Sequence, residues 1–129
     1  MNEEQLLKSG ERINQLFSTD IKIIQNSEVF SYSVDSVLLS RFPRFPKNGL
    51  IVDFCAGNGA VGLFASSRTK AKILSVEIQE RLADMAERSV RLNGLESQMQ
   101  VICDDLKNMP SHIQGSKVDL ILCNPPYFK

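Results

Sequence analysis

The sequence predicts an α/β fold in which about four parallel strands alternate with helices. From residue 50 onward, short apolar runs alternate with segments whose apolar residues recur at helical spacing. A glycine-rich turn follows the first apolar run, and polar residues follow the later runs. Parallel strands need crossover connections of this kind, and such sheets bind ligands beyond the carboxyl ends of their strands. We therefore expect a site among the residues that follow the strands.

The N-terminal part of the chain is predicted to contain a helix and a hairpin. Apolar residues at roughly helical spacing favour an amphipathic helix over residues 3–17, although Gly10 weakens it. Residues 21–24 and 29–30 are expected to form two short strands joined by a turn.

A second helix is expected just before the sheet. It runs through residues 37–42, and Ser33 or Asp35 is placed to cap its start. Pro43 and Pro46 end it, because proline cannot continue a helix.

The core is expected to span residues 48–129, after an N-terminal extension of residues 1–47 in the same domain. Within this core, the predicted helix over residues 80–92 presents one apolar face and stops at Asn93-Gly94. In chain order, the predicted elements are a strand at 50–52, a helix at 62–67, a strand at 72–76, a helix at 80–92, a strand at 99–102, a short helical or irregular piece at 106–113 and a strand at 118–122.

Composition is typical of a globular protein. The 129 residues include 15 Lys and Arg, 15 Asp and Glu, 43% hydrophobic residues and 23% charged residues. These values exclude a disordered tail, a collagen-like fibre and a coiled-coil rod, and no apolar run has the length of a membrane span. The acidic N-terminus predicts no signal peptide. Three separated cysteines and one histidine predict no metal site and a cytoplasmic location.

Three glycines mark a candidate nucleotide site. Gly57, Gly59 and Gly62 form a Gly-x-Gly-x-x-Gly pattern between a strand and a helix, where glycine allows a tight turn and close approach of a ligand. Glu77 stands twenty residues after Gly57, at the end of the next strand. A carboxylate in that place can accept hydrogen bonds from two ribose hydroxyls. A dinucleotide dehydrogenase and a methyltransferase both fit this pattern.

Asp53 separates these two classes. It lies four residues before Gly57, where a carboxylate would repel a pyrophosphate but attract a cation. S-adenosylmethionine carries an ammonium and a sulfonium group, so the residue favours this cofactor over a dinucleotide.

The predicted fourth strand ends in Asn124-Pro125-Pro126-Tyr127, and this sequence suits transfer to an amino nitrogen. The Asn124 side-chain oxygen and the Pro125 carbonyl can accept both N–H hydrogens of an amide-like amine, which leaves its lone pair free to attack. Proline fixes the backbone and adds no donor of its own. Tyr127 can stack on a flat substrate. Such positioning can lower a barrier by several kcal/mol.

These motifs resemble a known family. The stretch 53–59 resembles the first motif of class I S-adenosylmethionine-dependent methyltransferases, which have a Rossmann-like parallel sheet. The stretch 124–127 resembles the catalytic motif of those members that methylate amino nitrogens of adenine, guanine or glutamine. Residues 30–39 are similar to the bacterial tRNA(Val) adenine-N6 methyltransferase-like group with a small methyltransferase domain.

The resemblance implies a set of cofactor-binding residues. Residues of the glycine loop would line the methionine and ribose, Glu77 and Ile78 would meet the ribose and adenine, and Asp104 with Asp105 or Leu106 would meet the adenine amino group. The N-terminal extension would pack on the site and close over the methionine, although Asp35 is equally suited to a helix cap. The implied residues are Tyr32, Ser33, Asp35, Asp53, Cys55, Ala56, Gly57, Asn58, Gly59, Glu77, Ile78, Asp104, Asp105, Leu106 and Asn124.

The resemblance also implies the reaction. A methyl group would pass from S-adenosylmethionine to an exocyclic amino nitrogen, first of all N6 of adenine in tRNA or another RNA, and S-adenosylhomocysteine would leave. Asn124, Pro125, Pro126 and Tyr127 would hold the target. The alternatives are N5 of a glutamine in a translation release factor, a dinucleotide-binding module, and a binding fragment without turnover. No membrane or metal partner is expected, and the balanced charge offers RNA only two small basic clusters, near residues 41–47 and 68–72.

The chain departs from this family in one respect. About four core strands are fewer than family members usually carry, so we expect an incomplete sheet from a truncated chain. The last strand would then leave an uncovered edge, through which copies of the chain could associate.

Overall fold

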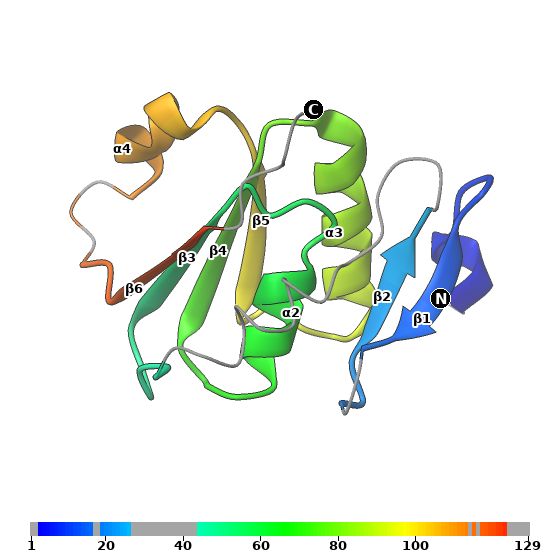
Figure 1. The fold of residues 1–129 in the computed structure, drawn as a ribbon, viewed down its shortest axis with the longest axis horizontal. Coiled ribbons are helices and arrows are strands. Elements are labelled where there is room, and N and C mark those ends of the chain that lie inside the picture. Colours follow the sequence, from blue (N-terminus) through cyan, green and yellow to red (C-terminus); the bar gives the residue numbers. More distant parts are fainter. Residues whose placement is uncertain (1–2, 17–18, 27–43, 114, 116, 124–129) are drawn as a thin grey trace.

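The computed structural model describes residues 3–16, 19–26, 44–113, 115 and 117–123 (Figure 1). Its centre is a parallel sheet with the strand order β5-β4-β3-β6. The strands are β3 (Leu50–Phe54), β4 (Lys72–Glu77), β5 (Met99–Cys103) and β6 (Leu120–Cys123). The order reverses next to β3, because β6 adds on the side opposite β4. The predicted α/β class with a parallel four-stranded sheet is confirmed.

Helices lie on both faces of this sheet (Figure 1). The helices α2 (Ala60–Ser66) and α3 (Glu80–Leu92) cover one face, and the short η2 (Leu106–Asn108) and α4 (Met109–His112) lie toward the other. Strand side chains alternate between the faces, so neighbouring residues such as Ile51 and Val52 belong to different core clusters.

The face under α2 is packed closely. Phe64 of α2 lies with Ile51 and Ile73 of the sheet, all nearly inaccessible, and each such burial contributes about 1.5–3 kcal/mol. A Cβ atom on Gly62 would lie 2.8 Å from Met99 Cε and 2.8 Å from Ser75 Oγ. Glycine at this position therefore lets α2 approach the sheet.

The N-terminal segment forms a separate two-stranded sheet. A 3-10 helix, η1 (Glu3–Leu6), precedes the antiparallel hairpin of β1 (Arg12–Gln15) and β2 (Lys22–Gln25). In Figure 1, α3 lies between this hairpin and the parallel sheet. Leu82 and Met85 face the hairpin side of α3 and pack with Ile24. The helix α3 thus packs one apolar side against the hairpin and another against the parallel sheet.

Polar side chains of α3 (Ser89) and of its C-cap residue (Asn93) bind main-chain groups of β2. Ser89 Oγ accepts a hydrogen bond from the Ile24 N–H at 2.9 Å. Asn93 accepts from the Lys22 N–H at 2.8 Å and donates to the Lys22 carbonyl at 2.6 Å. These side chains satisfy main-chain groups that a neighbouring strand would otherwise satisfy.

The predicted helix over residues 3–17 is wrong. Helical structure stops at Leu6, and Gly10 adopts a left-handed conformation with φ 80°. The chain then enters β1, where Ile13 pairs with Ile24. Leu6 and Ile13 had suggested one helix, although they belong to two different elements, η1 and β1.

The strand predicted near residues 21–24 has its observed partner earlier in the chain. Residues 22–25 form the predicted strand, but they pair with β1, which lies before them in the chain. The proposed partner at 29–30 and the helix through 37–42 lie outside the described residues.

The predicted core elements are confirmed with small shifts. The helix α3 spans the predicted residues 80–92, whereas α2 begins two residues earlier and β6 two residues later than expected. None of the described helices is long and apolar enough to cross a membrane.

Candidate cofactor site at the carboxyl edge of the sheet

The carboxyl ends of the four strands meet at one edge. Phe54 of β3 pairs with Val76 of β4 on one side and with Cys123 of β6 on the other. Glu77 at the end of β4 pairs with Cys103 of β5. The residues that follow these strands are therefore neighbours, as parallel pairing requires. Of the predicted site residues, Tyr32, Ser33, Asp35 and Asn124–Tyr127 lie outside the described part of the chain.

The loop between β3 and α2 turns sharply. Its φ angles are 58° at Cys55, 58° at Gly57 and 91° at Gly59. Ala56 N–H donates to the Val76 carbonyl at 2.9 Å, which fixes the loop to β4. A Cβ atom on Gly59 would lie 3.1 Å from the Cβ of Ala86 in α3, so conformation and space both favour glycine there. Cys55 holds a similar left-handed conformation without being glycine, which stores about 1–2 kcal/mol of strain.

Glu77 holds the glycine loop in place. The side chain is only 6% exposed, and Oε1 accepts from the Gly57 N–H at 2.8 Å. Oε2 accepts from the Gln79 N–H at 2.9 Å. A carboxylate offers about four acceptor positions, so one remains on each oxygen. Two hydroxyls of a ribose would fit this remaining capacity.

Asp53 is buried beneath the loop. It is 1% exposed, and Oδ2 has no hydrogen-bond partner among the described residues. Burial first, and then the charge of Glu77, raise the pKa of Asp53 to about 8, although the hydrogen bond from the Gly62 N–H opposes the shift. A cation bound at the loop would favour the ionised carboxylate. Asp53 therefore fits a positively charged cofactor, as the sequence suggested, but from beneath the loop.

Replacement of Asp53 by Asn is expected to change the pH dependence of stability. The folded pKa of about 8 exceeds the ordinary value of 3.8, so the folded state binds the proton more tightly. Wild-type stability should therefore fall as the pH rises between these values. The Asp53→Asn variant should keep its stability, with an advantage on the order of 5 kcal/mol at pH 9. Urea unfolding at pH 5, 7 and 9 measures this. Parallel pH curves for both proteins would contradict it, and exposed Asp20→Asn is the control.

Asn58 connects the loop to the N-terminal hairpin. Its side chain is fully buried, and Nδ2 donates to the Ile24 carbonyl at 3.3 Å. Its Oδ1 has no partner among the described residues. This placement lets the hairpin support the loop, and a buried free acceptor beside the loop suits an ammonium donor.

The loop after β5 carries the predicted adenine contacts. Asp104 N–H donates to the Glu77 carbonyl at 3.2 Å, so Asp104 borders the end of β4. Ile78 follows Glu77 and is 61% exposed, which leaves an apolar surface for a flat ring. Asp105 Oδ1 accepts from the Lys107 N–H at 3.1 Å and so shapes the turn into η2. The structure thus brings the described site residues to one edge.

His112 is a residue that sequence reasoning missed. Its Nε2 lies 2.8 Å from Asp104 Oδ2. The pKa of Asp104 is lowered to about 2, first by the hydrogen bond from His112 and then by that from Asn108. The spacing of four residues from Asp104 to Asn108 and again to His112 was the available signal.

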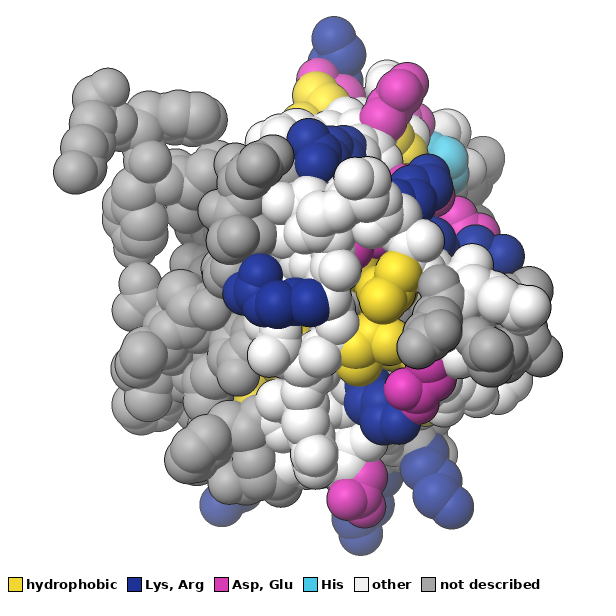
Figure 2. Space-filling view, turned by 90° about the vertical axis from the view of Figure 1, so that its right-hand side faces the viewer, with side chains coloured by type: hydrophobic (Ala, Val, Ile, Leu, Met, Phe, Trp, Pro, Cys, Tyr) yellow, Lys and Arg dark blue, Asp and Glu magenta, His cyan; other side chains and the backbone are white. Residues whose placement is uncertain are grey.

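The two ends of the sheet differ in charge, although Asp119 lies among the basic residues of the amino edge, where it accepts from the Leu50 N–H. Acidic side chains dominate the carboxyl edge, where Glu77, Asp104 and Asp105 follow the strands. The cluster Arg68, Lys70 and Lys72 lies at the amino edge, because Lys72 pairs with the first residue of β3. On the hairpin face, basic and acidic side chains are interspersed (Figure 2). The described carboxyl edge therefore suits a cation better than RNA phosphates.

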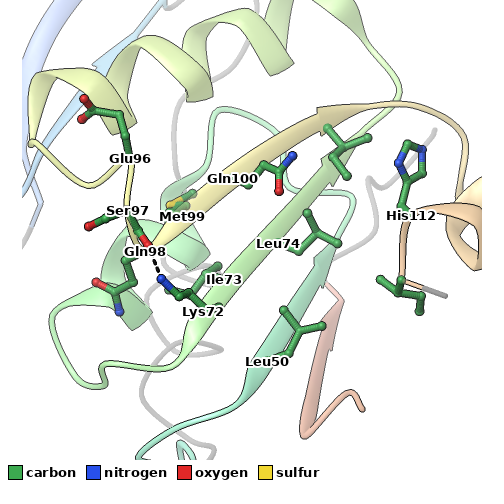
Figure 3. A pocket seen from close by; sticks show the side chains of 12 residues that line it. Leu50, Lys72, Ile73, Leu74, Glu96, Ser97, Gln98, Met99, Gln100 and His112 are labelled. Carbon is green, nitrogen blue, oxygen red and sulfur yellow. Dashed lines mark hydrogen bonds between the residues drawn. The ribbon is translucent and has the colours of Figure 1, made fainter. Parts of the chain in front are cut away.

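A pocket of about 410 Å³ lies away from the glycine loop and contains none of the predicted site residues (Figure 3). Leu50, Leu74 and His112 are among the residues that line it. Lys72 Nζ donates to the Ser97 carbonyl, and Gln98 Nε2 donates to two main-chain carbonyls. These polar groups already have partners. Within the described residues, no group of three or more His, Cys, Asp or Glu side chains could hold a metal ion.

Solved structures with this fold include methyltransferases. A SAM-dependent methyltransferase from Agrobacterium tumefaciens matches with a TM-score of 0.65 and 19% identity, over 95% of this chain and 42% of that one. TYW2 of P. horikoshii in complex with MeSAdo matches with a TM-score of 0.65 and 19% identity, over 78% of this chain and 38% of that one. These matches support the fold.

Curated relatives are closer in sequence. A tRNA1(Val) (adenine(37)-N6)-methyltransferase from Shewanella halifaxensis is 31% identical over 96 residues, which are 74% of this chain and 39% of the relative. The protein of that name from Bacteroides fragilis is 30% identical over 94 residues, or 73% of this chain and 40% of the relative. The chain thus spans about two fifths of their length. The family model described as "Methyltransferase small domain" matches residues 20–129, so the chain belongs to this methyltransferase small domain family.

Proposed function

We propose that this chain is the cofactor-binding part of an S-adenosylmethionine-dependent methyltransferase that modifies N6 of adenine in tRNA. The observation that carries the proposal is the glycine loop held by Glu77 at the carboxyl edge, with an acceptor position left on each oxygen of the Glu77 carboxylate. The family supports methyl transfer, and the names of the relatives support adenine in tRNA as the target.

The described residues fit this cofactor. When bound, S-adenosylmethionine supplies an electrophilic methyl carbon on a sulfonium centre. Glu77 would accept from the ribose hydroxyls, and Ile78 would lie against the adenine. Asp53 and Asn58 have buried oxygens without partners in the described structure, which suits the cationic methionine end. These residues bind and orient, and the acidic surroundings stabilise positive charge.

The target amine is assigned to the residues after β6. Cys123 pairs with Phe54, so the chain leaves β6 beside the start of the glycine loop. Asn124 and Pro125 would accept the two amine hydrogens, Pro126 would hold the turn, and Tyr127 would stack on the base. The displaced proton would leave for water after transfer.

The proposed substrate and the exposed sheet edge suggest the partners of this chain. The proposed partner is tRNA, and a release-factor glutamine is the alternative because its amide presents the same two hydrogens. Association between copies is proposed at β6, an edge of the described sheet whose Ile121 is 57% exposed.

Methylation of tRNA in vitro tests the proposal. Purified chain, tRNA and S-adenosylmethionine with a labelled methyl group should yield labelled N6-methyladenosine in a nucleoside digest. Asn124→Ala should lower the rate by about 100-fold or more, because one positioned polar contact to the reacting group typically contributes this much. Gln100→Ala, exposed on β5, is the matched control. Label in a release-factor glutamine instead, or an undiminished rate for Asn124→Ala, would contradict the assignment.

A further inference from the structure

The carboxylate of Asp104 is held in one orientation by groups that follow it in the chain. His112 Nε2 lies 2.8 Å from Oδ2. Asn108 Nδ2 donates to Oδ1 at 2.8 Å, and the Asp105 N–H donates to Oδ1 at 2.7 Å. Three of about four acceptor positions are therefore filled, and the remaining one lies on Oδ2, the oxygen that His112 contacts.

His112 reaches this carboxylate from α4. Figure 3 shows its ring near the chain that leaves β5. Asp104 is ionised at neutral pH, as an aspartate with its ordinary pKa is, and its hydrogen bonds lower that pKa further, to about 2. An ionised carboxylate only accepts, so the His112 Nε2 must carry the hydrogen of this contact, whatever the charge of the ring. The direction of the hydrogen bond is therefore fixed.

The fixed carboxylate stands where it can distinguish purines. Asp104 borders the end of β4 through its bond to the Glu77 carbonyl, next to the exposed Ile78. The 6-amino group of adenine is a donor, which an oriented carboxylate oxygen accepts. A carbonyl oxygen at position 6, as in hypoxanthine, would be repelled by this carboxylate oxygen, because both are acceptors. A ligand that leaves such a polar group without a hydrogen-bond partner binds much more weakly.

We infer that His112 is a positioning residue that orients Asp104 and thereby sets the preference of the site for a 6-amino purine. This inference rests on the proposed cofactor. It adds a residue of α4 that acts on the site through Asp104.

A second, purely structural role would give a different result. His112 also ties α4 to the loop after β5, so its loss could destabilise the domain. Loss of stability would weaken all ligands alike. Loss of orientation at Asp104 would weaken only the ligand that carries the 6-amino group, and the ratio of two affinities separates these roles.

The test uses isothermal titration with S-adenosylhomocysteine and S-inosylhomocysteine, which differ in the amino or carbonyl group at position 6. His112→Phe keeps a ring but removes the donor, and His112→Gln keeps a donor near the position of Nε2. Ser111→Ala, on the same helix, is the control, because the Ser111 hydroxyl donates to the Asn108 carbonyl and not to the Asp104 carboxylate. The titrations are made on the full chain at pH 7.5.

Wild type and Ser111→Ala should prefer S-adenosylhomocysteine. His112→Phe should lower its affinity by about tenfold, as expected when one charge-assisted hydrogen bond loses its orientation. The affinity of S-inosylhomocysteine should stay within about twofold, and His112→Gln should restore most of the preference. An unchanged ratio in His112→Phe would overturn the inference, and if that variant does not fold, failure of His112→Gln to retain the preference would do so. Absence of S-adenosylhomocysteine binding by wild type would instead overturn the proposed function.

Discussion

Replacement of Glu77 by alanine is expected to lower the affinity for S-adenosylhomocysteine by about 100-fold or more. Both oxygens of this carboxylate accept main-chain hydrogen bonds, from Gly57 at 2.8 Å and from Gln79 at 2.9 Å. The substitution removes the proposed ribose acceptors and also leaves these two N–H groups without partners. The first loss weakens binding directly, and the second lets the glycine loop depart from its binding conformation.

Two further variants refine this prediction. Glu77→Gln keeps an acceptor for one N–H but points an amide donor at the other, so its affinity should lie between wild type and Glu77→Ala. Glu80→Gln removes an exposed carboxylate from the start of α3 and should leave binding unchanged. Titration calorimetry with S-adenosylhomocysteine measures all three. Equal affinities for wild type and Glu77→Ala would show that this residue does not form the ribose site.

Replacement of Arg88 by alanine is expected to produce the largest loss of stability, about 3–5 kcal/mol. Its side chain is only 5% exposed and donates to the Leu6 carbonyl at 2.7 Å and to Glu11 Oε2 at 2.7 Å. It also bonds Asp84 one turn earlier in α3, at 3.0 Å. The substitution would leave the buried carboxylate of Glu11 without its cation, and the N-terminal segment would lose its main attachment to α3.

A double-mutant cycle checks this prediction by urea unfolding. Arg88→Ala and Glu11→Ala should each be strongly destabilising, but the double variant should lose much less than the sum, because no unpaired charge remains. Arg91→Ala, exposed on the same helix, is the matched control. Additive losses, or a loss below about 1 kcal/mol for Arg88→Ala, would contradict a buried ion pair of this kind.

The contribution of the Arg88–Glu11 ion pair to stability depends on pH with the opposite sign from that of Asp53. The Arg88 hydrogen bonds lower the pKa of Glu11 below its ordinary 4.5. The pair therefore stabilises the protein above that pH, and the contribution disappears as the pH falls through the lowered folded pKa. Asp53, with its raised pKa, destabilises the folded state toward alkaline pH.

The sequence predicted the core well because its signals were local. In α3, an apolar face and the stop at Asn93-Gly94 define both the helix and its end. The N-terminal error had a tertiary cause. The strand β2 is bound along its edge by Ser89 and Asn93, about seventy residues later, and no local pattern announces such a partner.

In the site, too, local patterns were predictable, whereas contacts between distant residues were not. Spacing placed Glu77 at the strand end beside the glycine loop, but its bond to the Gly57 N–H is visible only in three dimensions. Asp53 was expected to present a negative charge, and its depth beneath the loop adds a raised pKa that spacing cannot reveal. His112 was missed because its four-residue spacing from Asn108, and that of Asn108 from Asp104, becomes a hydrogen-bonded group only in the folded loop.

The most direct test of the central claim is thermal unfolding of the chain with S-adenosylhomocysteine, with NAD and with buffer alone. A ligand at about 100 times its dissociation constant adds about 2.7 kcal/mol to stability. For a domain of this size, that corresponds to a rise in Tm on the order of 10 °C. The account predicts this rise with S-adenosylhomocysteine and none with NAD. A rise with NAD alone, or no rise with S-adenosylhomocysteine, would contradict it.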